Sequence, residues 1–477
     1  MASRYERLSP LDASFLYAES RVAHMHVGSL SIFEDPGLTT EAFYRHIERR
    51  LDLVPRFRKK LMRVPFDLGR PVWVDDEHFD VRFHVRHTGL ARPGGERELK
   101  LLMGRLMSIP LDRDRPLWEL WLVDLPRKRK ALIQKTHHAL IDGISGVDLA
   151  TVLLDVRPET DDPPPVPWKP QPPPTPAELL KETLVEQAIE PREGLRRIRK
   201  MLQAPRAVKG RIVETAKGML HLGKASLDVA PKTSLSRQIG PHRRFEIVRT
   251  KLSEIKGIKN RVGCKVNDVV LALVAGGLRH LLLTRGDAIE GLEMRVAVPV
   301  SVRDPSERMT LGNRVAMMFA CLPVGEPDPM ERLLRIQREM ADVKESKEAV
   351  GADALVKLAG FAPPTILALA ARAVAVQWMA NLTVTNVPGP QFPLYLRGGR
   401  MLEAFPFVPL IGTMSVGVAV LSYDGKLNFG LSGDWDVVPD LSVFAEGIEG
   451  ALSELKRCCG VGARRSPRKR KSSAPSR

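Results

Sequence analysis

Apolar residues in the first third of the chain recur at two different spacings. A spacing of three to four residues is typical of amphipathic helices, whereas strict alternation is typical of half-buried strands. Proline and glycine separate the segments, as they do at turns. The pattern predicts helices at 39–62, 96–109 and 143–156 and strands within 70–90, 117–125 and 129–140.

The last half of the chain repeats this mixture of strands and helices. Asp424-Gly425 lies between two alternating runs and predicts a hairpin turn. The pattern predicts a strand then a helix over 243–260, a helix over 265–286, strands within 294–304 and 381–393, a hairpin over 414–434 and a helix over 441–458. The fold class indicated is therefore α/β (α+β), in two halves of similar make-up.

A proline-rich stretch from 161 to 176 divides the chain, because so many prolines fit neither a helix nor a central strand. We expect four regions on this basis. They are an N-terminal domain at 1–160, a linker with a basic amphipathic helix at 161–235, a C-terminal domain at 236–460 and a disordered basic tail at 461–477.

The composition indicates a soluble globular protein in a reducing compartment. Hydrophobic residues make up 44% of the 477 residues and charged residues 27%. The N-terminus lacks the apolar core of a secretory signal, and the most apolar window, 363–380, contains Arg372 and is predicted to be a buried helix. The four cysteines show neither metal-ligand spacing nor a disulfide framework, so we expect a cytoplasmic protein without a structural metal.

The formal net charge of +17 predicts an anionic partner. The basic residues concentrate in 462–477 and in 191–226, where they alternate with aliphatic residues. Neither stretch contains the aromatic residues on which bases stack, so no nucleic acid is expected. Segment 191–226 fits a basic helix on an anionic membrane or lipid-droplet surface, and it fits equally a solvated helix that packs on the domains by one face.

The strongest chemical signal is HHALIDG, residues 137–143, where the strand 129–140 gives way to a helix. The chain has no Walker loop, no G-x-G-x-x-G, no HExxH and no G-x-S-x-G. Without an activated serine or cysteine, acyl transfer through a covalent enzyme intermediate is disfavoured. A histidine can instead deprotonate an attacking hydroxyl and return the proton to a thiolate leaving group, provided that both substrates meet beside it.

This motif resembles the HHxxxDG signature of the bacterial wax ester synthase/acyl-CoA:diacylglycerol acyltransferase family. The same signature occurs in the condensation domains of peptide synthetases, but further stretches also resemble the lipid family. These stretches are 8–19, 115–125, 265–279, 298–304, 311–314, 386–390 and 421–434, so the resemblance covers nearly the whole chain.

The resemblance implies two chloramphenicol-acetyltransferase-like domains with a substrate tunnel at their interface. It implies that His138 is the general base, that His137 is its accessory neighbour, and that Asp142 is a structural carboxylate paired with Arg303. Gly143 would let the backbone turn beneath the histidine. Residues expected near the substrates are Asn267, Asp268, Asn386 and Trp118, each with an ordinary structural alternative as a helix cap, a turn or a core residue.

The function expected from the resemblance is transfer of a long-chain acyl group from acyl-CoA to diacylglycerol or a fatty alcohol. Acyl-CoA would be a co-substrate, and no cofactor would be needed. The protein would associate peripherally with the inner face of the membrane or with lipid droplets. Two alternatives stay open: a condensation-type enzyme that takes its acyl group from a carrier protein, and a catalytically silent lipid-binding protein.

Overall fold

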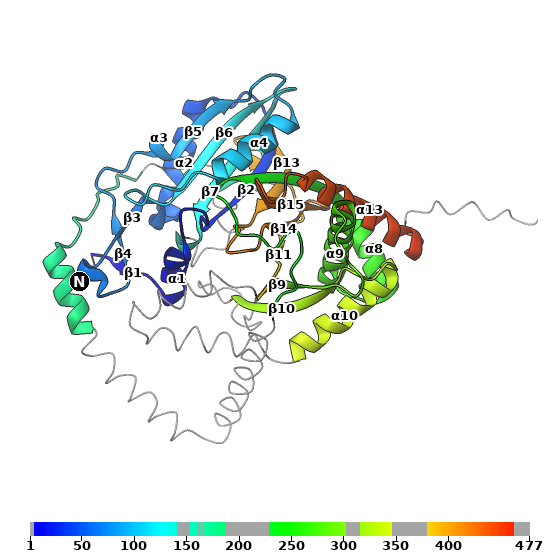
Figure 1. Cartoon of the computed structure of the whole chain (residues 1–477). Helices are drawn as coiled ribbons and strands as arrows, with labels where there is room; N and C mark the ends of the chain where they lie inside the picture. Colours follow the sequence, from blue (N-terminus) through cyan, green and yellow to red (C-terminus); the bar gives the residue numbers. More distant parts are fainter. Residues whose placement is uncertain are drawn as a thin grey trace, which may run out of the picture.

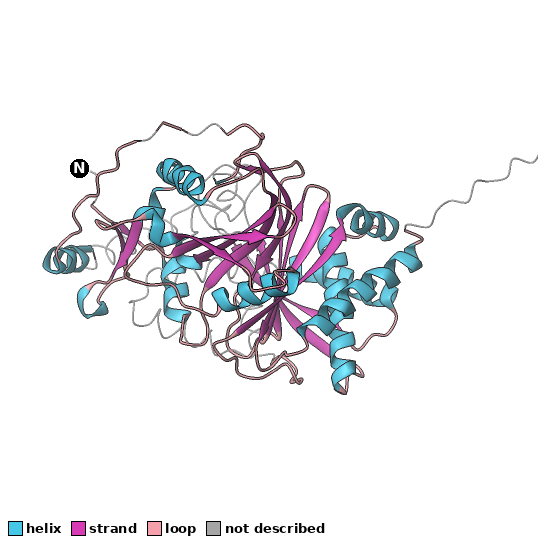
Figure 2. Ribbon diagram, turned by 90° about the horizontal axis from the view of Figure 1, so that it is seen from above, coloured by secondary structure: helices cyan, strands magenta, loops and turns pink. Residues whose placement is uncertain are grey.

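The computed structural model describes residues 4–140, 153–160, 163–164, 166–186, 229–301, 315–345 and 379–461. Its framework is a pair of six-stranded sheets, with a three-stranded sheet at the N-terminal end of the molecule. Figure 1 shows the chain passing from one sheet to the other, and Figure 2 shows helices on the outer sides of the sheets. The mixed helix and sheet architecture predicted from the sequence is confirmed.

The first six-stranded sheet carries the histidine pair. Its strands, in spatial order, are β12 (Tyr395–Leu396), β13 (Gly399–Phe407), β2 (His26–Glu34), β7 (Arg129–His137), β6 (Trp118–Leu125) and β5 (Val85–Gly89). The labelled helices of this half are α1 (Pro10–Ala18), α2 (Thr40–Arg50), α3 (Val81–His84) and α4 (Glu96–Met107). A further helix covers 176–186 and packs on the three-stranded sheet. Alternate residues of β7 enter the cores on the two faces of the sheet, as the period of two requires.

The second six-stranded sheet contains the predicted hairpin. Its order is β10 (Val315–Pro323), β9 (Glu293–Ser301), β11 (Leu382–Pro388), β14 (Val416–Tyr423), β15 (Lys426–Asp434) and β8 (Arg243–Lys251). At the turn between β14 and β15, Asp424 and Gly425 both adopt positive φ, as a two-residue hairpin turn demands. The helices are α8 (Leu252–Val262), α9 (Val266–Arg285), α10 (Pro329–Glu345) and α13 (Leu441–Cys459).

Helix α9 is the centre of the second core. It is long and apolar enough to cross a membrane, the one such helix among the described residues, but 72% of its apolar window is buried inside the protein. A Cβ added to Gly276 would lie 2.5 Å from the Ala451 Cβ of α13, so the glycine permits close helix packing. Such burial is typical of a core helix.

The second half of the chain contributes strand β13 to the sheet of the first half. Although β13 follows the linker in sequence, it pairs with β2 in the sheet of the first half, with Phe405 opposite Leu30. In Figure 1 the orange β13 accordingly lies beside the blue β2. The continuous boundaries predicted for the two domains, 1–160 and 236–460, therefore assign 395–407 to a different half from the one whose sheet it completes.

The predicted helix at 39–62 is half as long as expected. Helix α2 ends at Arg50 and is followed by the 3-10 turns η1 (Leu51–Leu53) and η2 (Pro55–Arg58). Pro55 disfavours helical backbone in Val54, which has φ −134° and ψ 66°. The chain then forms β3 (Lys59–Met62), which joins β1 (Glu6–Arg7) and β4 (Val72–Asp75) in the three-stranded sheet.

Four predicted features lie wholly or mainly outside the described residues. They are the helix 143–156, the basic segment 191–226, the apolar window 363–380 and the basic tail 461–477. In the proline-rich stretch, residues 163–164 and 166–175 form neither helix nor strand, as the composition predicts, and a helix begins at 176.

Candidate functional site

The end of β7 places the two histidines in different surroundings. His137 is the last residue of the strand, pairs with His26 of β2, and is 1% exposed. His138 begins the 3-10 turn η4 (His138–Leu140) and is half-buried. The change from strand to turn therefore directs two adjacent imidazoles to different places, and only the second is partly open.

A hydrogen bond identifies which ring nitrogen of His137 is an acceptor. The N–H of Ala139 donates to Nδ1 of His137 at 3.0 Å, so this nitrogen is an acceptor. The N–H of the ring is then at Nε2, which is buried and lies 3.6 Å from Oε2 of Glu19. His137 thus connects a buried carboxylate to the backbone of the turn that contains His138.

Glu19, directly after α1, holds several segments together. Its Oε2 accepts a hydrogen bond from Nε of Arg113 at 3.1 Å, and its Oε1 accepts one from the N–H of Met25 at 3.3 Å. Burial favours the neutral acid, but the contacts with His137 and Arg113 outweigh it and hold the pKa of Glu19 well below its ordinary value. Glu19 is therefore a charged carboxylate behind the histidine pair.

His138 is held from two sides by the N-terminal segment. Its backbone N–H donates to the carbonyl oxygen of Met25 at 2.8 Å. Its ring stacks on Phe15 of α1 with centroids 3.9 Å apart and an interplanar angle of 21°. The ring atom Nδ1 is buried. Phe15 and Met25 thus fix both the ring plane and the backbone of the residue expected to be the base.

Basic groups packed around this carboxylate are shifted toward their neutral forms. Burial lowers the pKa of His24 and lowers that of His26 further, with additional repulsion from Lys135 on the second ring. Burial also lowers the pKa of Lys135 to about 8. Desolvation disfavours the charged form of each base, so the neighbourhood carries less positive charge than its residue types suggest.

The structure brings together two asparagines that are far apart in sequence. Nδ2 of Asn386 on β11 donates to Oδ1 of Asn267, in the first turn of α9, at 3.4 Å. The adjacent Asp268 is 3% exposed, and its Oδ2 accepts a hydrogen bond from the N–H of Lys265 at 2.8 Å. Asp268 therefore caps α9, which is the structural alternative for that residue.

Trp118 packs as a core residue. Its side chain is 1% exposed, and its Nε1 donates to the carbonyl oxygen of Phe57 at 2.8 Å. The ring of His84 stacks against it with centroids 4.6 Å apart. An indole satisfied in this way supports the sheet beneath the histidines through packing.

The comparisons with known proteins agree over nearly the whole chain. Residues 8–270 match the wax ester synthase/diacylglycerol acyltransferase catalytic domain, and residues 311–456 match the C-terminal domain of the same family. The chain belongs to this family. It is an acyltransferase.

Relatives of this acyltransferase include two proteins of Mycobacterium tuberculosis. A putative diacylglycerol O-acyltransferase is 34% identical over 466 residues, which cover 95% of this chain and 90% of the relative. A probable diacylglycerol O-acyltransferase, tgs1, is 34% identical over 455 residues, which cover 94% of this chain and 95% of that one.

Solved structures show the same architecture. The wax ester synthase/diacylglycerol acyltransferase from Marinobacter aquaeolei matches with a TM-score of 0.67 at 28% identity, over 95% of this chain and 100% of that one. The first condensation domain of the calcium-dependent antibiotic synthetase matches with a TM-score of 0.58 at 18% identity, over 95% and 97% of the two chains. The second likeness concerns the fold alone.

Three site residues predicted for the acyltransferase lie outside the described part of the chain: Asp142, Gly143 and Arg303. The predicted contact between Asp142 and Arg303 stays a prediction. Within the described residues, no group of three or more His, Cys, Asp or Glu side chains is arranged to hold a metal ion.

Sequence reasoning missed the residues that surround the histidines. Phe15, Glu19 and Met25 come from the N-terminal segment, and His26 comes from β2. The stretch 8–19 was recognised as similar to the family, but nothing in its spacing indicates contact with a motif more than a hundred residues away.

Proposed function

We propose that this acyltransferase transfers a long-chain acyl group from acyl-CoA to the free hydroxyl of diacylglycerol, with His138 as the general base. The observation that carries the proposal is the position of His138. It is the half-buried histidine at the strand end, stacked on Phe15 and tied to Met25 by its backbone. Membership of the family, and relatives named diacylglycerol O-acyltransferases, support the choice of substrates.

The proposed reaction needs one proton carrier and two positioned substrates. The imidazole of His138 removes the hydroxyl proton while the oxygen attacks the thioester carbonyl carbon. This attack forms the new C–O bond and gives a tetrahedral intermediate, and the C–S bond breaks as that intermediate collapses. The imidazolium then gives its proton to the departing thiolate of CoA. No covalent enzyme intermediate, cofactor or metal takes part.

Two further parts of the proposal follow from the substrates. Fatty alcohols present the same nucleophilic hydroxyl, so wax ester formation belongs to the proposed activity. Diacylglycerol is confined to lipid phases, so we propose a cytoplasmic protein bound peripherally to the inner face of the membrane or to lipid droplets. The formal charge of +17 favours both the phosphates of CoA and an anionic lipid surface.

The decisive experiment compares His138→Ala with His87→Ala. His87 lies on β5, pairs with Asp124 and is remote from the motif, so it controls for the loss of an imidazole. Both variants are purified, checked by circular dichroism, and assayed with labelled acyl-CoA against diacylglycerol and fatty alcohols. We expect His138→Ala to lose about a hundredfold or more in kcat and His87→Ala to retain activity.

Three outcomes would contradict the proposal. Activity retained in a folded His138→Ala variant would exclude this residue as the base. Acyl transfer from a carrier-protein thioester without turnover of acyl-CoA would favour the condensation-type reaction. Lipid binding without any ester product, for every pair of substrates, would identify a catalytically silent protein.

A further inference from the structure

The tip of the hairpin between β3 and β4 exposes an aromatic side chain. Phe66 is 85% exposed, and its backbone has φ 60° and ψ 16°. A bulky residue in this left-handed region is strained, and Asp67 next to it also has a positive φ of 50°. Phe66 is therefore held outward in a strained backbone conformation, although its ring is not packed into a core.

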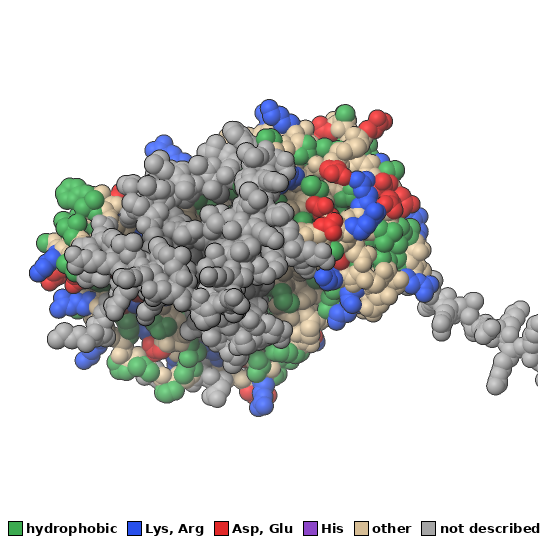
Figure 3. Space-filling model, turned by 90° about the horizontal axis from the view of Figure 1, so that it is seen from below, with side chains coloured by type: hydrophobic (Ala, Val, Ile, Leu, Met, Phe, Trp, Pro, Cys, Tyr) green, Lys and Arg blue, Asp and Glu red, His purple; other side chains and the backbone are tan. Residues whose placement is uncertain are grey.

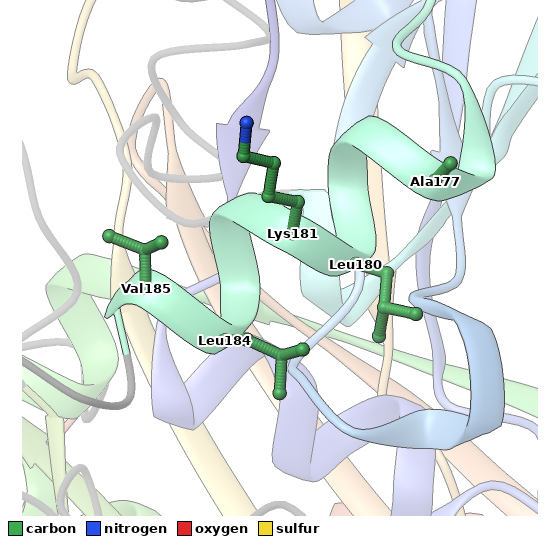
Figure 4. Close-up of a pocket in the computed structure, with 5 residues that line it drawn as sticks. All are labelled: Ala177, Leu180, Lys181, Leu184 and Val185. Carbon is green, nitrogen blue, oxygen red and sulfur yellow. The ribbon is translucent and has the colours of Figure 1, made fainter.

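A helix beside this hairpin has apolar residues on two sides. In helix 176–186, Leu179 and Thr183 are buried, and Leu179 belongs to one apolar cluster with Val64 and Val72. On its outer side an open hollow of about 460 Å³ is lined by Ala177, Leu180, Lys181, Leu184 and Val185. Figure 4 shows Leu180 and Leu184 projecting together from one side of the helix, with Lys181 and Val185 projecting from another.

The loop between β3 and β4 packs against this helix. A Cβ added to Gly69, just past the tip, would lie 2.6 Å from Cγ2 of Thr183. Leu68 is 41% exposed, and Leu184 and Val185 are each 50% exposed. We name the tip face as the set of Phe66, Leu68, Leu180, Leu184 and Val185.

Basic side chains border the tip face. Arg4, Arg63 and Lys181 are exposed, and neither Arg63 nor Lys181 forms an ion pair within the described ranges. Of the acids near this face, Glu182 accepts a hydrogen bond from Tyr5 and Glu186 pairs with Arg7. Glu178 accepts a hydrogen bond from the N–H of Thr175, and Asp67 is exposed beside Phe66. Figure 3 shows hydrophobic side chains with Lys and Arg side chains among them at this end of the molecule.

The tip face lies next to the helix that covers the proposed base. Tyr17 of α1 is close enough to feel the charges of Asp67, Arg63 and Arg70 around the hairpin. Two residues earlier, Phe15 stacks on His138. In Figure 1, α1 accordingly lies beside the small sheet of β1, β3 and β4. A surface bound by the tip face would therefore lie close to the histidine pair.

We propose that the tip face docks on an anionic lipid surface, with Phe66 inserted among the lipids and Arg63 and Lys181 at the headgroups. This docking rests on the proposed function, because it would place α1 at the lipid phase that contains diacylglycerol. Exposed aromatic and aliphatic side chains with basic ones beside them suit the boundary between water and acyl chains.

The test uses the full-length double variant Phe66→Asp/Leu184→Asp. Its matched control is Leu101→Asp/Leu283→Asp, which changes leucines of α4 and α9 that are 49% and 51% exposed and lie outside the tip face. Binding is measured by co-sedimentation with vesicles of phosphatidylcholine and phosphatidylglycerol. We expect the tip-face variant to bind at least about tenfold more weakly, and the control to bind like the wild type.

An activity assay separates docking from catalysis. Each protein is given diacylglycerol within vesicles or a short-chain diacylglycerol dissolved in water. The tip-face variant should lose activity on the vesicle acceptor by about the same factor as binding and keep its kcat on the dissolved acceptor. Pure phosphatidylcholine vesicles should bind the wild type more weakly, since they lack the negative headgroups.

Several results would overturn the docking proposal. These are unchanged vesicle binding by the tip-face variant, equal loss of activity on both acceptors, and self-association of the wild type that the variant abolishes while neither binds vesicles. If the wild type makes no ester from either acceptor, yet its vesicle binding depends on Phe66 and Leu184, the proposed function fails and the docking surface stands.

Discussion

Replacing Glu19 by glutamine tests whether the carboxylate positions the turn that contains His138. The change removes the charge and keeps the size of the side chain. In the native protein, carboxylate oxygens face Nε2 of His137 at 3.6 Å and Nε2 of His26 at 3.7 Å. A carboxylate only accepts hydrogen bonds, whereas an amide also donates them. We therefore expect the variant to change which nitrogen of His137 is protonated, without leaving a cavity at position 19.

The expected loss in kcat can be estimated from one hydrogen bond. If the amide nitrogen faces His137, its Nε2 becomes an acceptor and the ring proton moves to Nδ1. That nitrogen can then no longer accept from the N–H of Ala139. The loss of such a bond costs about 1 kcal/mol, which corresponds to roughly a fivefold change in an equilibrium. We expect kcat to fall about five- to tenfold and KM for acyl-CoA to change by less than about twofold.

The assay combines kinetics with a direct view of the ring. Steady-state kcat and KM are measured for Glu19→Gln and for the control Glu246→Gln, whose native carboxylate pairs with Lys100 away from the histidines. Ring ¹⁵N NMR reports which nitrogen of His137 is protonated. An unchanged kcat, or a native His137 protonated on Nδ1, would refute the assigned role.

The same substitution has a defined effect on acid stability. The pKa of Glu19 is lower in the folded chain than its value of about 4.3 in an unfolded chain. The carboxylate therefore stabilises the fold above about pH 4.3, and this contribution is lost as the pH falls below that value. Glu19→Gln should flatten the acid side of the stability curve, which thermal unfolding at a series of pH values measures.

Two further substitutions test the packing and the buried charge. Gly430→Ala should lower Tm by roughly 5 °C, because its Cβ would lie 1.8 Å from the carbonyl oxygen of Pro406. The control is Gly89→Ala, because no atom lies within 4 Å of the added Cβ. Equal Tm values for the two variants would contradict the close contact between β15 and β13. Lys135→Met should stabilise the protein at pH 7 by about 1–2 kcal/mol. Lowering the pKa of Lys135 from 10.5 to about 8 implies a burial cost of roughly 3 kcal/mol, but the variant also loses the hydrogen bond from Nζ to the Ile109 carbonyl oxygen. The cost of burying the charged lysine is present below pH 8 and is relieved between pH 8 and 10.5, so the stability advantage of the variant should vanish in that range. A difference in unfolding free energy that does not depend on pH would refute the lowered pKa of Lys135.

Periodicity predicted most helices and strands, because the spacing of buried residues within each element can be read from a short stretch of sequence. The alternation in 117–125 and the apolar run 129–140 gave β6 and β7, and the helix 265–286 became α9 with Asp268 at its start. The pattern did not reveal that β13 belongs to the sheet of the first half. Pairing between β13 and β2 depends on contacts between residues nearly 400 positions apart, for which a single sequence carries no local signal.

The candidate site was predicted only as far as the motif reaches. The family resemblance distinguished His138 from His137, and the structure gives the two rings different exposure and different partners. It did not predict Glu19 or Phe15 as neighbours, because side chains meet there through the packing of α1 on η4. Trp118 carried two interpretations, and its buried indole with a satisfied N–H is that of a core residue.

The surroundings of His138 show why an HHxxxDG motif is by itself weak evidence of activity. The motif supplies the imidazole, but Phe15 sets the plane of the ring, Met25 binds its backbone N–H, and Glu19 fixes the neighbouring imidazole. All three come from one N-terminal stretch, so a chain that keeps the motif and changes this stretch loses the geometry while it keeps the signature. Conversely, a motif that occurs together with the aromatic and acidic residues at the positions of Phe15 and Glu19 indicates a base that is held in place. Function is therefore better inferred from that combination than from the seven-residue signature.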